Sequence, residues 1–518
     1  MIGFRREASE ILRELDALRA ADAPTHGGRV LSYVYDSGLD ELDELAGRAA
    51  RRVQPVNGLD PTTFGSVAAM ERAVVGFARR VLGGGDGGGA DGEVVVGSVT
   101  SGGTESCLLA VKSARDAWRA ARIGSPRVPR VVAPVTVHAA FHKAAHYFGL
   151  ELDLVPVDPE TGTLAPSAIE ERLGDDVALV VVSAPSYPFA SLDPVADVAA
   201  ITAARGIALH VDACIGGFAL AFWPEPLPAW NLSVPGVTSI SADLHKYGYA
   251  PKGASVLLTR GRDRQRRQYF ATTGWPGYPV VNPTMTGSKP AGPLAAAWAI
   301  IEALGEPGFR DLTAQTARAT AELRAAIDGI EGLRVVGEPV GPLLAVAADE
   351  AAPVTSRVDP HHWADAAREA GWQLQLQPGL AQADGTRLPH TTHLTVTPVT
   401  ERVLPELVPA LVAAADEVRG IPRIDGRVAL AGLAEALPGG VGGALLDAGG
   451  TDAAAFDLFA ASLDSDAAAA VLSAAGLLGG EGALPDRLAP VLALVEALPG
   501  SLTERLLIEL LARVVEPT

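Results

Sequence analysis

Short apolar runs alternate with amphipathic segments through the central part of the chain. The runs have the length of buried strands, and the segments between them repeat apolar residues at helical spacing. This alternation predicts strands near Val94, over 130–134, 152–157 and 177–183, and from Ile207, with helices beginning near Glu105, His138, Pro166 and Pro194. Strands that alternate with helices favour a mostly parallel sheet with helices on both faces, so the predicted fold class is α/β.

Changes in this pattern divide the chain into four parts. We expect an N-terminal helical segment over residues 1–60 and a large domain over residues 61–300. A small α+β domain should follow over residues 301–420, and an all-α extension over residues 425–518. Outside the large sheet, the spacing predicts helices over 7–20, 39–51 and 293–304, and strands near Leu333 and Leu394. The extension carries no catalytic constellation, and we expect it to pack on a second subunit or on another protein.

Charge and composition narrow the classes of partner. The formal net charge of the 518-residue chain is -19, which argues against nucleic acid and against an anionic membrane surface. No stretch reaches the length of a membrane span without charge or proline, so no membrane anchor is expected. Cys107 and Cys214 lie among small or apolar neighbours, which favours reduced thiols in a cytoplasmic protein.

The pair His245-Lys246 is the first candidate for chemistry. It follows an apolar, strand-like segment and precedes a turn rich in glycine and proline. Lysine is seldom buried without a partner, so packing explains this position poorly. A Schiff-base enzyme needs a lysine in such a cleft, and we expect desolvation to lower the pKa of Lys246 and free its nucleophilic form.

A candidate phosphate cradle and a candidate carboxylate lie elsewhere in the predicted sheet. The segment from Gly97 to Cys107 joins a strand to a helix, so its glycines and first helical amides suit an anion, with Ser101 and Thr104 as hydroxyl donors. An ordinary capped turn is the alternative. Asp212 ends a later strand, where it could pair with a pyridine nitrogen or, alternatively, cap a helix.

His138 is the candidate for stacking on a flat cofactor ring. Its spacing to His142 on the same predicted helix also raises a metal site. That segment lacks the glutamate or third ligand that zinc would require, so no metal is expected.

These motifs together resemble sphingosine-1-phosphate lyase, and in particular its soluble bacterial relatives, within the pyridoxal-phosphate-dependent group II decarboxylase family. The resemblance covers about residues 28–420 and is carried by Thr100–Glu105, His138–Phe141, Ser183–Pro185, Leu209–Cys214, Gly216–Phe218, Ser239–Asp243, His245–Gly253 and Asn282–Pro290. It implies a fold-type-I homodimer with shared active sites and pyridoxal 5'-phosphate as cofactor.

The resemblance also implies roles for individual residues. Lys246 would be the Schiff-base lysine, Asp212 the partner of the pyridine nitrogen and His138 the stacking ring. Gly103 and Thr104 would hold the cofactor phosphate beside His245, and a neighbouring subunit would contribute Gly287 and Ser288. The implied reaction is retro-aldol cleavage of a β-hydroxy amine to an aldehyde and an amine, with Tyr249 and Lys252 as candidates for proton transfer or anion binding.

The substrate remains open at this stage. Tyr33, Tyr35 and Asn57 are candidate substrate residues, although buried tyrosines often only fill space. Family members carry a histidine where Asn57-Gly-Leu-Asp-Pro61 has Asp60, and a negative charge there disfavours a substrate phosphate. An amine or amino acid without phosphate is therefore an alternative substrate. Alternative functions are an amino-acid α-decarboxylase and a cofactor-bound scaffold that acts through its extension.

Overall fold

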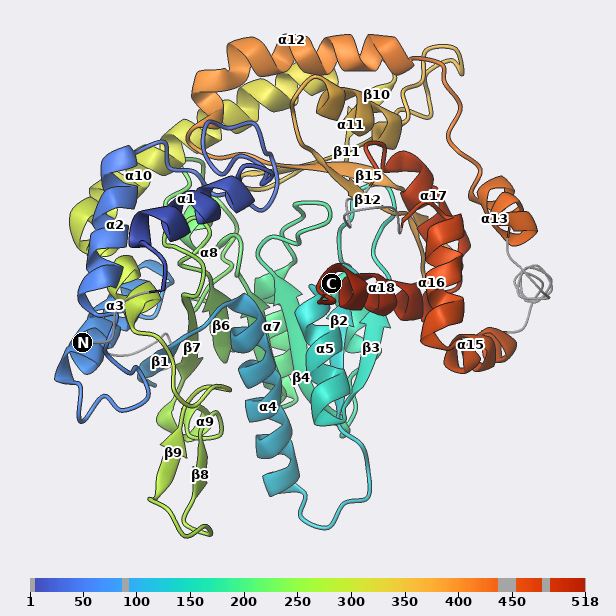
Figure 1. Ribbon diagram of the computed structural model, residues 1–518. Coiled ribbons are helices and arrows are strands. Elements are labelled where there is room, and N and C mark those ends of the chain that lie inside the picture. The colour runs from blue at the N-terminus through green and yellow to red at the C-terminus, as the bar shows by residue number, and fades with distance from the viewer. Residues whose placement is uncertain (1–4, 86–92, 437–452, 478–484, 518) are drawn as a thin grey trace.

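The computed structural model describes residues 5–85, 93–436, 453–477 and 485–517. A seven-stranded sheet forms the centre of the large domain (Figure 1). In spatial order its strands are β1 (Val95–Thr100), β7 (Ser255–Arg260), β6 (Ser239–Ala242), β5 (Ala208–Asp212), β4 (Val177–Ser183), β2 (Arg130–Pro134) and β3 (Glu151–Val155). Strand β7 runs antiparallel to both neighbours, and the other pairings are parallel. The predicted α/β fold class is confirmed.

Helices cover both faces of this sheet because successive side chains of a strand point to opposite sides. In β4, Leu179 and Val181 pack toward α4 and α5, whereas Val180 and Val182 belong to the core on the other face, with α3 and α7. Helix α4 spans Gly103–Ala121, α5 spans Ala139–Phe148, α3 spans Gly65–Val81 and α7 spans Val195–Ala204. Shorter helices are α6 (Pro166–Glu170), α8 (Gly217–Leu220) and α9 (Arg262–Gln265).

The helix that links the two domains is longer than its pattern predicts. The expected end near Leu304 is instead a kink in α10 (Gly292–Asp328), where Gly305 has a φ of 52°. Glycine takes this left-handed conformation without the clash that a Cβ would cause. Beyond the kink α10 packs on the small domain, and before it α10 packs against α2 (Asp40–Arg52). The remaining N-terminal helix is α1 (Ala8–Arg19).

A four-stranded antiparallel sheet forms the small domain. Its order is β10 (Leu333–Val335), β11 (Leu343–Ala348), β15 (Thr391–Thr395) and β12 (Gln375–Gln377), and it packs against α11 (Pro360–Glu369) and α12 (Thr400–Val418). Two hairpins stand apart from both sheets. They are β8–β9 (Phe270–Thr272 and Val280–Asn282) and β13–β14 (Leu380–Ala381 and Arg387–Leu388).

The extension is helical and has its own apolar cluster. Its helices are α13 (Gly426–Ala436), α15 (Ala453–Ser462), α16 (Ser465–Ala474), α17 (Ala489–Ala497) and α18 (Gly500–Val514). Figure 1 shows α17 beside the small sheet and α18 in front of α5. Both carboxylate oxygens of Asp365 on α11 accept from the first amides of α17 at 2.8 Å. The extension is therefore fastened to the small domain of its own chain.

Among the helices in these ranges, none combines the length and apolar character that crossing a membrane requires.

Candidate active site

A cavity of about 490 Å³ lies between the large sheet and the small domain, beyond the carboxyl ends of β4 and β5. Ligands of open α/β sheets bind at this edge. Five residues that the sequence singled out line the cavity, namely Lys246, Asp212, His138, Tyr33 and Tyr35. They come from segments more than two hundred residues apart in the chain, so the tertiary fold brings them together.

Lys246 is held by a carboxylate that the sequence analysis did not assign to the site. Its Nζ lies 3.0 Å from Oδ2 of Asp243, whose side chain is only 2% exposed. Burial is the largest single influence and would lower the pKa of Lys246, but the charge and hydrogen bond of Asp243, together with Tyr35 and Cys214, outweigh it, so the pKa is raised. The expectation of a lowered lysine pKa was therefore wrong. Asp243 stands three residues before the lysine in the quoted motif, and that spacing was the signal that could have identified it.

The start of α4 forms a cradle against Asp243 and His245. A Cβ on Gly103 would lie 2.7 Å from Oδ2 of Asp243, and one on Gly102 would lie 3.3 Å from Cε1 of His245. Only glycine leaves this space free at position 103. Thr104 follows as an exposed residue in the first turn of α4, where backbone amides lack helical partners. The structure therefore brings Gly103, Thr104 and His245 into one cluster.

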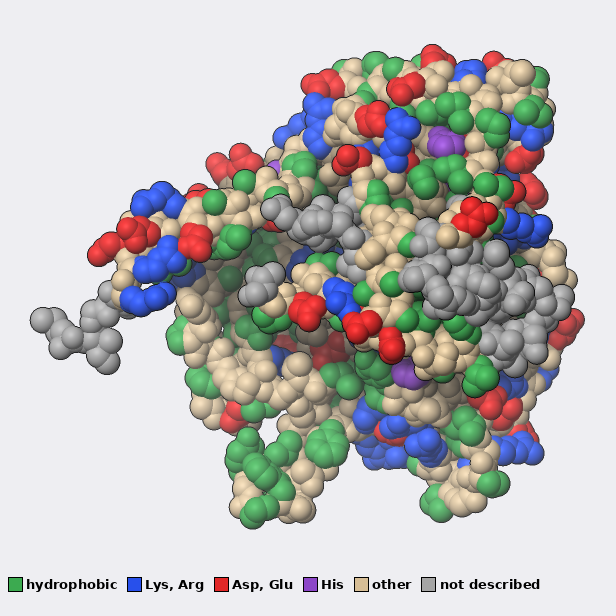
Figure 2. Space-filling model, turned by 45° about the vertical axis from the view of Figure 1, so that its right-hand side comes forward, with side chains coloured by type: hydrophobic (Ala, Val, Ile, Leu, Met, Phe, Trp, Pro, Cys, Tyr) green, Lys and Arg blue, Asp and Glu red, His purple; other side chains and the backbone are tan. Residues whose placement is uncertain are grey.

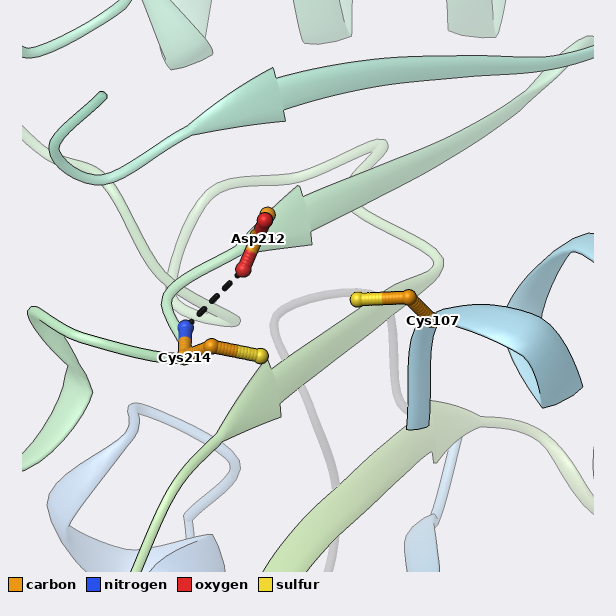
Figure 3. A group of neighbouring side chains, drawn as sticks. All are labelled: Cys107, Asp212 and Cys214. Atoms are coloured by element: carbon orange, nitrogen blue, oxygen red, sulfur yellow. Dashed lines mark hydrogen bonds between the residues drawn. The ribbon is translucent and has the colours of Figure 1, made fainter. Parts of the chain in front are cut away.

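Asp212 lies beside both cysteines, as Figure 3 shows. Oδ1 of Asp212 accepts from the amide of Cys214 at 3.0 Å, and the ligand-type atoms of Cys107, Asp212 and Cys214 lie within 4.8 Å of one another. The hydrogen bond between the two thiols lowers the pKa of Cys107, but burial and the nearby carboxylates together outweigh it, so that pKa is raised. The same hydrogen bond and then burial raise the pKa of Cys214. Both cysteines are free and buried, as the sequence predicted. Protonated thiols are poor metal ligands.

His138 is oriented by its own helix. It caps the start of α5, and Nδ1 accepts from the amide of Ala140 at 3.1 Å. Because Nδ1 is the acceptor, the ring proton lies on Nε2 when the histidine is neutral. The cap fixes the plane of a ring that lines the cavity.

Lys252 lies over the rim of the cavity. Its Nζ is 4.6 Å from the ring centroid of Tyr35 and donates to the backbone oxygens of His245 and Tyr33, at 3.2 and 3.3 Å. Desolvation and then the charge of Lys246 lower the pKa of Lys252 to about 8. The structure thus joins Lys252 to Tyr33 and Tyr35, the two cavity tyrosines that the sequence singled out.

Two groups of predicted site residues lie apart from the cavity. The ring of Tyr249 is buried and stacks on Phe309 of α10 at 6.2 Å, so it packs in the core and does not line the cavity. Nδ2 of Asn57 donates to Oγ of Ser288 at 3.1 Å, and Gly287 precedes that serine. Asn57 and Ser288 are therefore neighbours of each other on the described chain, but not of Lys246.

Other cavity residues carried no sequence signal. Tyr187 lines the cavity and stacks on the buried His393 at 4.1 Å, and the hydroxyl of Tyr33 donates to Oε1 of Gln375. Tyr33 has a φ of 60°, which is uncommon for a residue with a Cβ. Gln375 and the residues after it come from the small domain, more than a hundred residues beyond Lys246, so no local pattern links them to the site.

Comparison with known proteins agrees with this geometry. The family model described as the pyridoxal-dependent decarboxylase conserved domain matches residues 54–344. The chain belongs to the pyridoxal-dependent decarboxylase family. A second model, for the C-terminal HTH domain of pyridoxal-dependent enzymes, matches residues 430–513.

Several relatives are named sphingosine-1-phosphate lyases. The sphingosine-1-phosphate lyase of Oryza sativa is 32% identical, over 83% of this chain and 77% of its own length. The structure of a Burkholderia pseudomallei sphingosine-1-phosphate lyase superposes with a TM-score of 0.72 at 30% identity, over 81% of this chain and 93% of that one. Glutamate decarboxylase of Lactobacillus brevis has a TM-score of 0.70 at 19% identity, over 82% and 95% of the two chains, which shows the shared fold.

Family membership confirms three expectations drawn from the sequence. The resemblance was correct, the cofactor is pyridoxal phosphate, and the protein is a lyase dependent on that cofactor. The site has the groups that this cofactor requires. Within the described ranges, Nδ1 of His245 is buried without a hydrogen-bond partner, and the ring of His245 lies against Gly102 at the cradle. Buried polar atoms are normally satisfied, so this nitrogen fits a site made for a polar ligand.

Proposed function

We propose that this chain cleaves the Cα–Cβ bond of a β-hydroxy amine, releasing an aldehyde and a smaller amine. The observation that carries the proposal is the cavity that joins Lys246, Asp212 and His138 in a chain whose relatives are named sphingosine-1-phosphate lyases. Pyridoxal phosphate, when bound, supplies an electron sink for the bond that breaks. Lys246 would hold the cofactor through its amine, Asp212 its pyridine nitrogen, and Gly103, Thr104 and His245 its phosphate.

The chain's own residues supply the remaining chemistry. Retro-aldol cleavage requires removal of the proton from the β-hydroxyl, so a neutral base must reach that oxygen. Lys252 suits this task because its pKa of about 8 leaves part of it neutral near pH 7, and because it adjoins Tyr35. His138, held by its cap on α5, would keep the reacting group flat against the cavity wall. Apolar side chains on the opposite wall, including Leu376, Leu380 and Leu388, would receive an aliphatic chain.

The surroundings of Asp60 support a substrate without a phosphate group. Its carboxylate accepts from the amides and hydroxyls of Thr62 and Thr63, at 2.6 to 3.2 Å. These hydrogen bonds, those of Thr62 first, lower the pKa of Asp60, so the group is negatively charged at neutral pH. Asp60 is therefore an anion whose carboxylate is satisfied by local hydrogen bonds. A histidine at the same position, as in other family members, could instead be a cation.

A homodimer with shared active sites is part of the proposal. The β8–β9 hairpin projects from the molecule and exposes Phe270, Trp275, Tyr278 and Val281, and hydrophobic side chains crowd the left-hand projection at the foot of Figure 2. Exposed apolar patches of this kind mark protein interfaces. Asn57 and Ser288 lie outside the cavity of their own chain, so we expect their side chains to contact the active site of a second subunit.

One product assay tests the reaction. Purified protein loaded with cofactor is incubated with phosphorylated and free β-hydroxy amines and amino acids, and aldehyde and carbon dioxide are measured together. We expect aldehyde without carbon dioxide, and none with Lys246→Ala. Carbon dioxide with the matching amine would instead assign the chain to the α-decarboxylases.

Mixing two inactive variants tests the shared site. Homodimers of Lys246→Ala and of Ser288→Ala are combined and allowed to exchange subunits. If Ser288 serves the neighbouring subunit, each mixed dimer contains one site with both residues, and activity returns. If activity stays at the level of the separate variants while mixed dimers form, the shared site is excluded.

A further inference from the structure

A buried carboxylate of the extension contacts the chain segment that lines the substrate cavity. Glu496 lies on α17, and its side chain is only 4% exposed. Its Oε2 accepts from Arg387 at 2.6 Å and from Arg423 at 2.5 Å. Burial would raise the pKa of Glu496, but the amide of Gly379 and then the two arginines lower it. Glu496 is therefore a charged group held by three partners outside its own helix.

Two of these partners belong to the segment that forms one wall of the cavity. Between Gln375 and Thr391, this segment contributes eight of the cavity's lining residues, namely Gln375, Leu376, Gln377, Pro378, Leu380, Leu388, Pro389 and Thr391. We call residues 375–391 the wall segment. Gly379 and Arg387 lie on its two halves, and a Cβ on Gly379 would be 3.1 Å from Oε2 of Glu496. The carboxylate thus joins the two sides of the β13–β14 hairpin at its base.

The small domain and the large domain hold the same segment at other points. Nε2 of His361 on α11 contacts the backbone oxygen of Gln377 at 2.9 Å, and Asp359 contacts His390 at 2.7 Å. At the hairpin tip, Gln382 bonds both the amide and the oxygen of Val157, at 2.9 and 2.8 Å. Between these points, the ion pair of Arg387 with the buried Glu496 holds the base of the hairpin.

We propose that Glu496 is a positioning residue for substrate binding, and that the extension completes the substrate cavity through it. Without the carboxylate, Arg387 and the amide of Gly379 lose a shared acceptor, and the hairpin base separates from α17. The apolar residues Pro378, Leu380 and Leu388 then no longer form a fixed wall. The cofactor groups are attached to the large sheet, so they stay in place. The assignment of a substrate to this cavity rests on the proposed function.

The extension itself provides a matched control. Glu509 on α18 is also nearly buried, with a side chain 8% exposed, and it also pairs with two arginines, Arg505 and Arg513, at 3.0 and 2.7 Å. Both of those arginines belong to α18 itself. Glu509→Gln therefore removes a comparable ionic cluster from the extension without touching the wall segment.

The first measurement does not depend on any substrate. Hydrogen exchange of the full-length, cofactor-loaded protein is compared for Glu496→Gln, Glu509→Gln and the parent chain. We expect amides within residues 377–391 to exchange faster by about tenfold in Glu496→Gln and to be unchanged in Glu509→Gln. Equal protection of these amides in all three proteins would overturn the proposal, whatever reaction the enzyme catalyses.

The second measurement separates binding from chemistry with whichever amine the product assay identifies. We expect Glu496→Gln to raise KM about tenfold with kcat changed less than about twofold, and with the visible cofactor absorbance unchanged. If Glu496→Gln unfolds the extension, Arg387→Gln removes the same contact from the wall side and should give the same shift in KM. A normal KM in Arg387→Gln, or an equal rise in Glu509→Gln, would overturn the proposal.

Discussion

Nζ of Lys246 lies 3.0 Å from Oδ2 of Asp243, three residues earlier in the chain. The pair forms where β6 ends and the following turn folds back over it. Asp243 also fills the space beside Gly103, so one carboxylate contacts both the lysine and the cradle at α4. This arrangement keeps the lysine charged and fixed in the unliganded protein.

Replacement of Asp243 should destabilise the unliganded protein. In Asp243→Asn the charged Lys246 loses its buried partner, and we expect a loss of about 3 kcal/mol in the free energy of unfolding at neutral pH. Urea denaturation without cofactor measures this loss. Asp263→Asn, which removes an exposed pair with Arg266, is the control and should have little effect. Equal stability of the two variants would contradict a structural role for Asp243.

The sign of each pKa shift defines the pH range of this stabilisation. The pKa of Asp243 is lowered in the folded protein, so its contribution is present above the ordinary value of about 3.9 and is lost as the pH falls through the lower folded value. The pKa of Lys246 is raised, so its contribution is present below the ordinary value of about 10.4 and is lost as the pH rises through the higher folded value. The stability difference between the parent chain and Asp243→Asn should therefore narrow in strong acid.

Lys252 should define the alkaline rise of activity. A lysine amine must be neutral to accept a proton, so kcat/KM should increase as the pH rises through about 8. In Lys252→Arg the group stays charged, and this rise should disappear, with activity at pH 9 reduced by about 100-fold. A pH–rate profile of the two proteins checks this. An unchanged profile in the variant would remove Lys252 from the proton transfer.

The side chain of Glu105 connects the start of α4, our candidate phosphate cradle, to the segment that follows β9. Its Oε2 accepts from the amide of Ser101, and its Oε1 from the amide of Met285, both at 2.6 Å. A glutamine at this position would turn an N–H group toward one of the two amide donors. We expect Glu105→Gln to lower stability by about 1–3 kcal/mol and to speed cofactor release. Thermal unfolding and dialysis against buffer measure the two effects, and Glu41→Gln, on the exposed start of α2, should change neither.

The extension should not bind duplex DNA, although the HTH model matches it. Residues 430–513 contain three arginines, no lysine and eleven acidic residues. Protein–DNA affinity depends largely on cationic contacts to phosphates, which this composition cannot supply. Fluorescence anisotropy of a labelled duplex at low salt should show no change on addition of the protein. Saturable binding would overturn the prediction and the exclusion of nucleic acid drawn from the net charge.

The sequence alone determined the fold class and singled out most of the residues that we propose for the cofactor site. Strands end at Asp212 and just before His245, and α4 begins at Gly103, because local apolar periodicity and glycine placement carry that information. Residues at the carboxyl ends of parallel strands share one edge of the sheet, so their proximity follows from the pattern. The order of the motifs also sufficed to identify the family.

Tertiary structure decided the electrostatics and the far wall of the cavity. The raised pKa of Lys246 depends on a 3.0 Å contact with Asp243 and on further groups that together outweigh burial, and no composition or spacing measures that balance. Tyr249 follows Lys246 closely, yet the turn directs its ring toward Phe309 of α10. Glu496 and Arg387 are separated by more than a hundred residues, and they meet only because α17 packs on the small domain. Long-range contacts of this kind arise from packing, which acts after the local pattern has formed the elements.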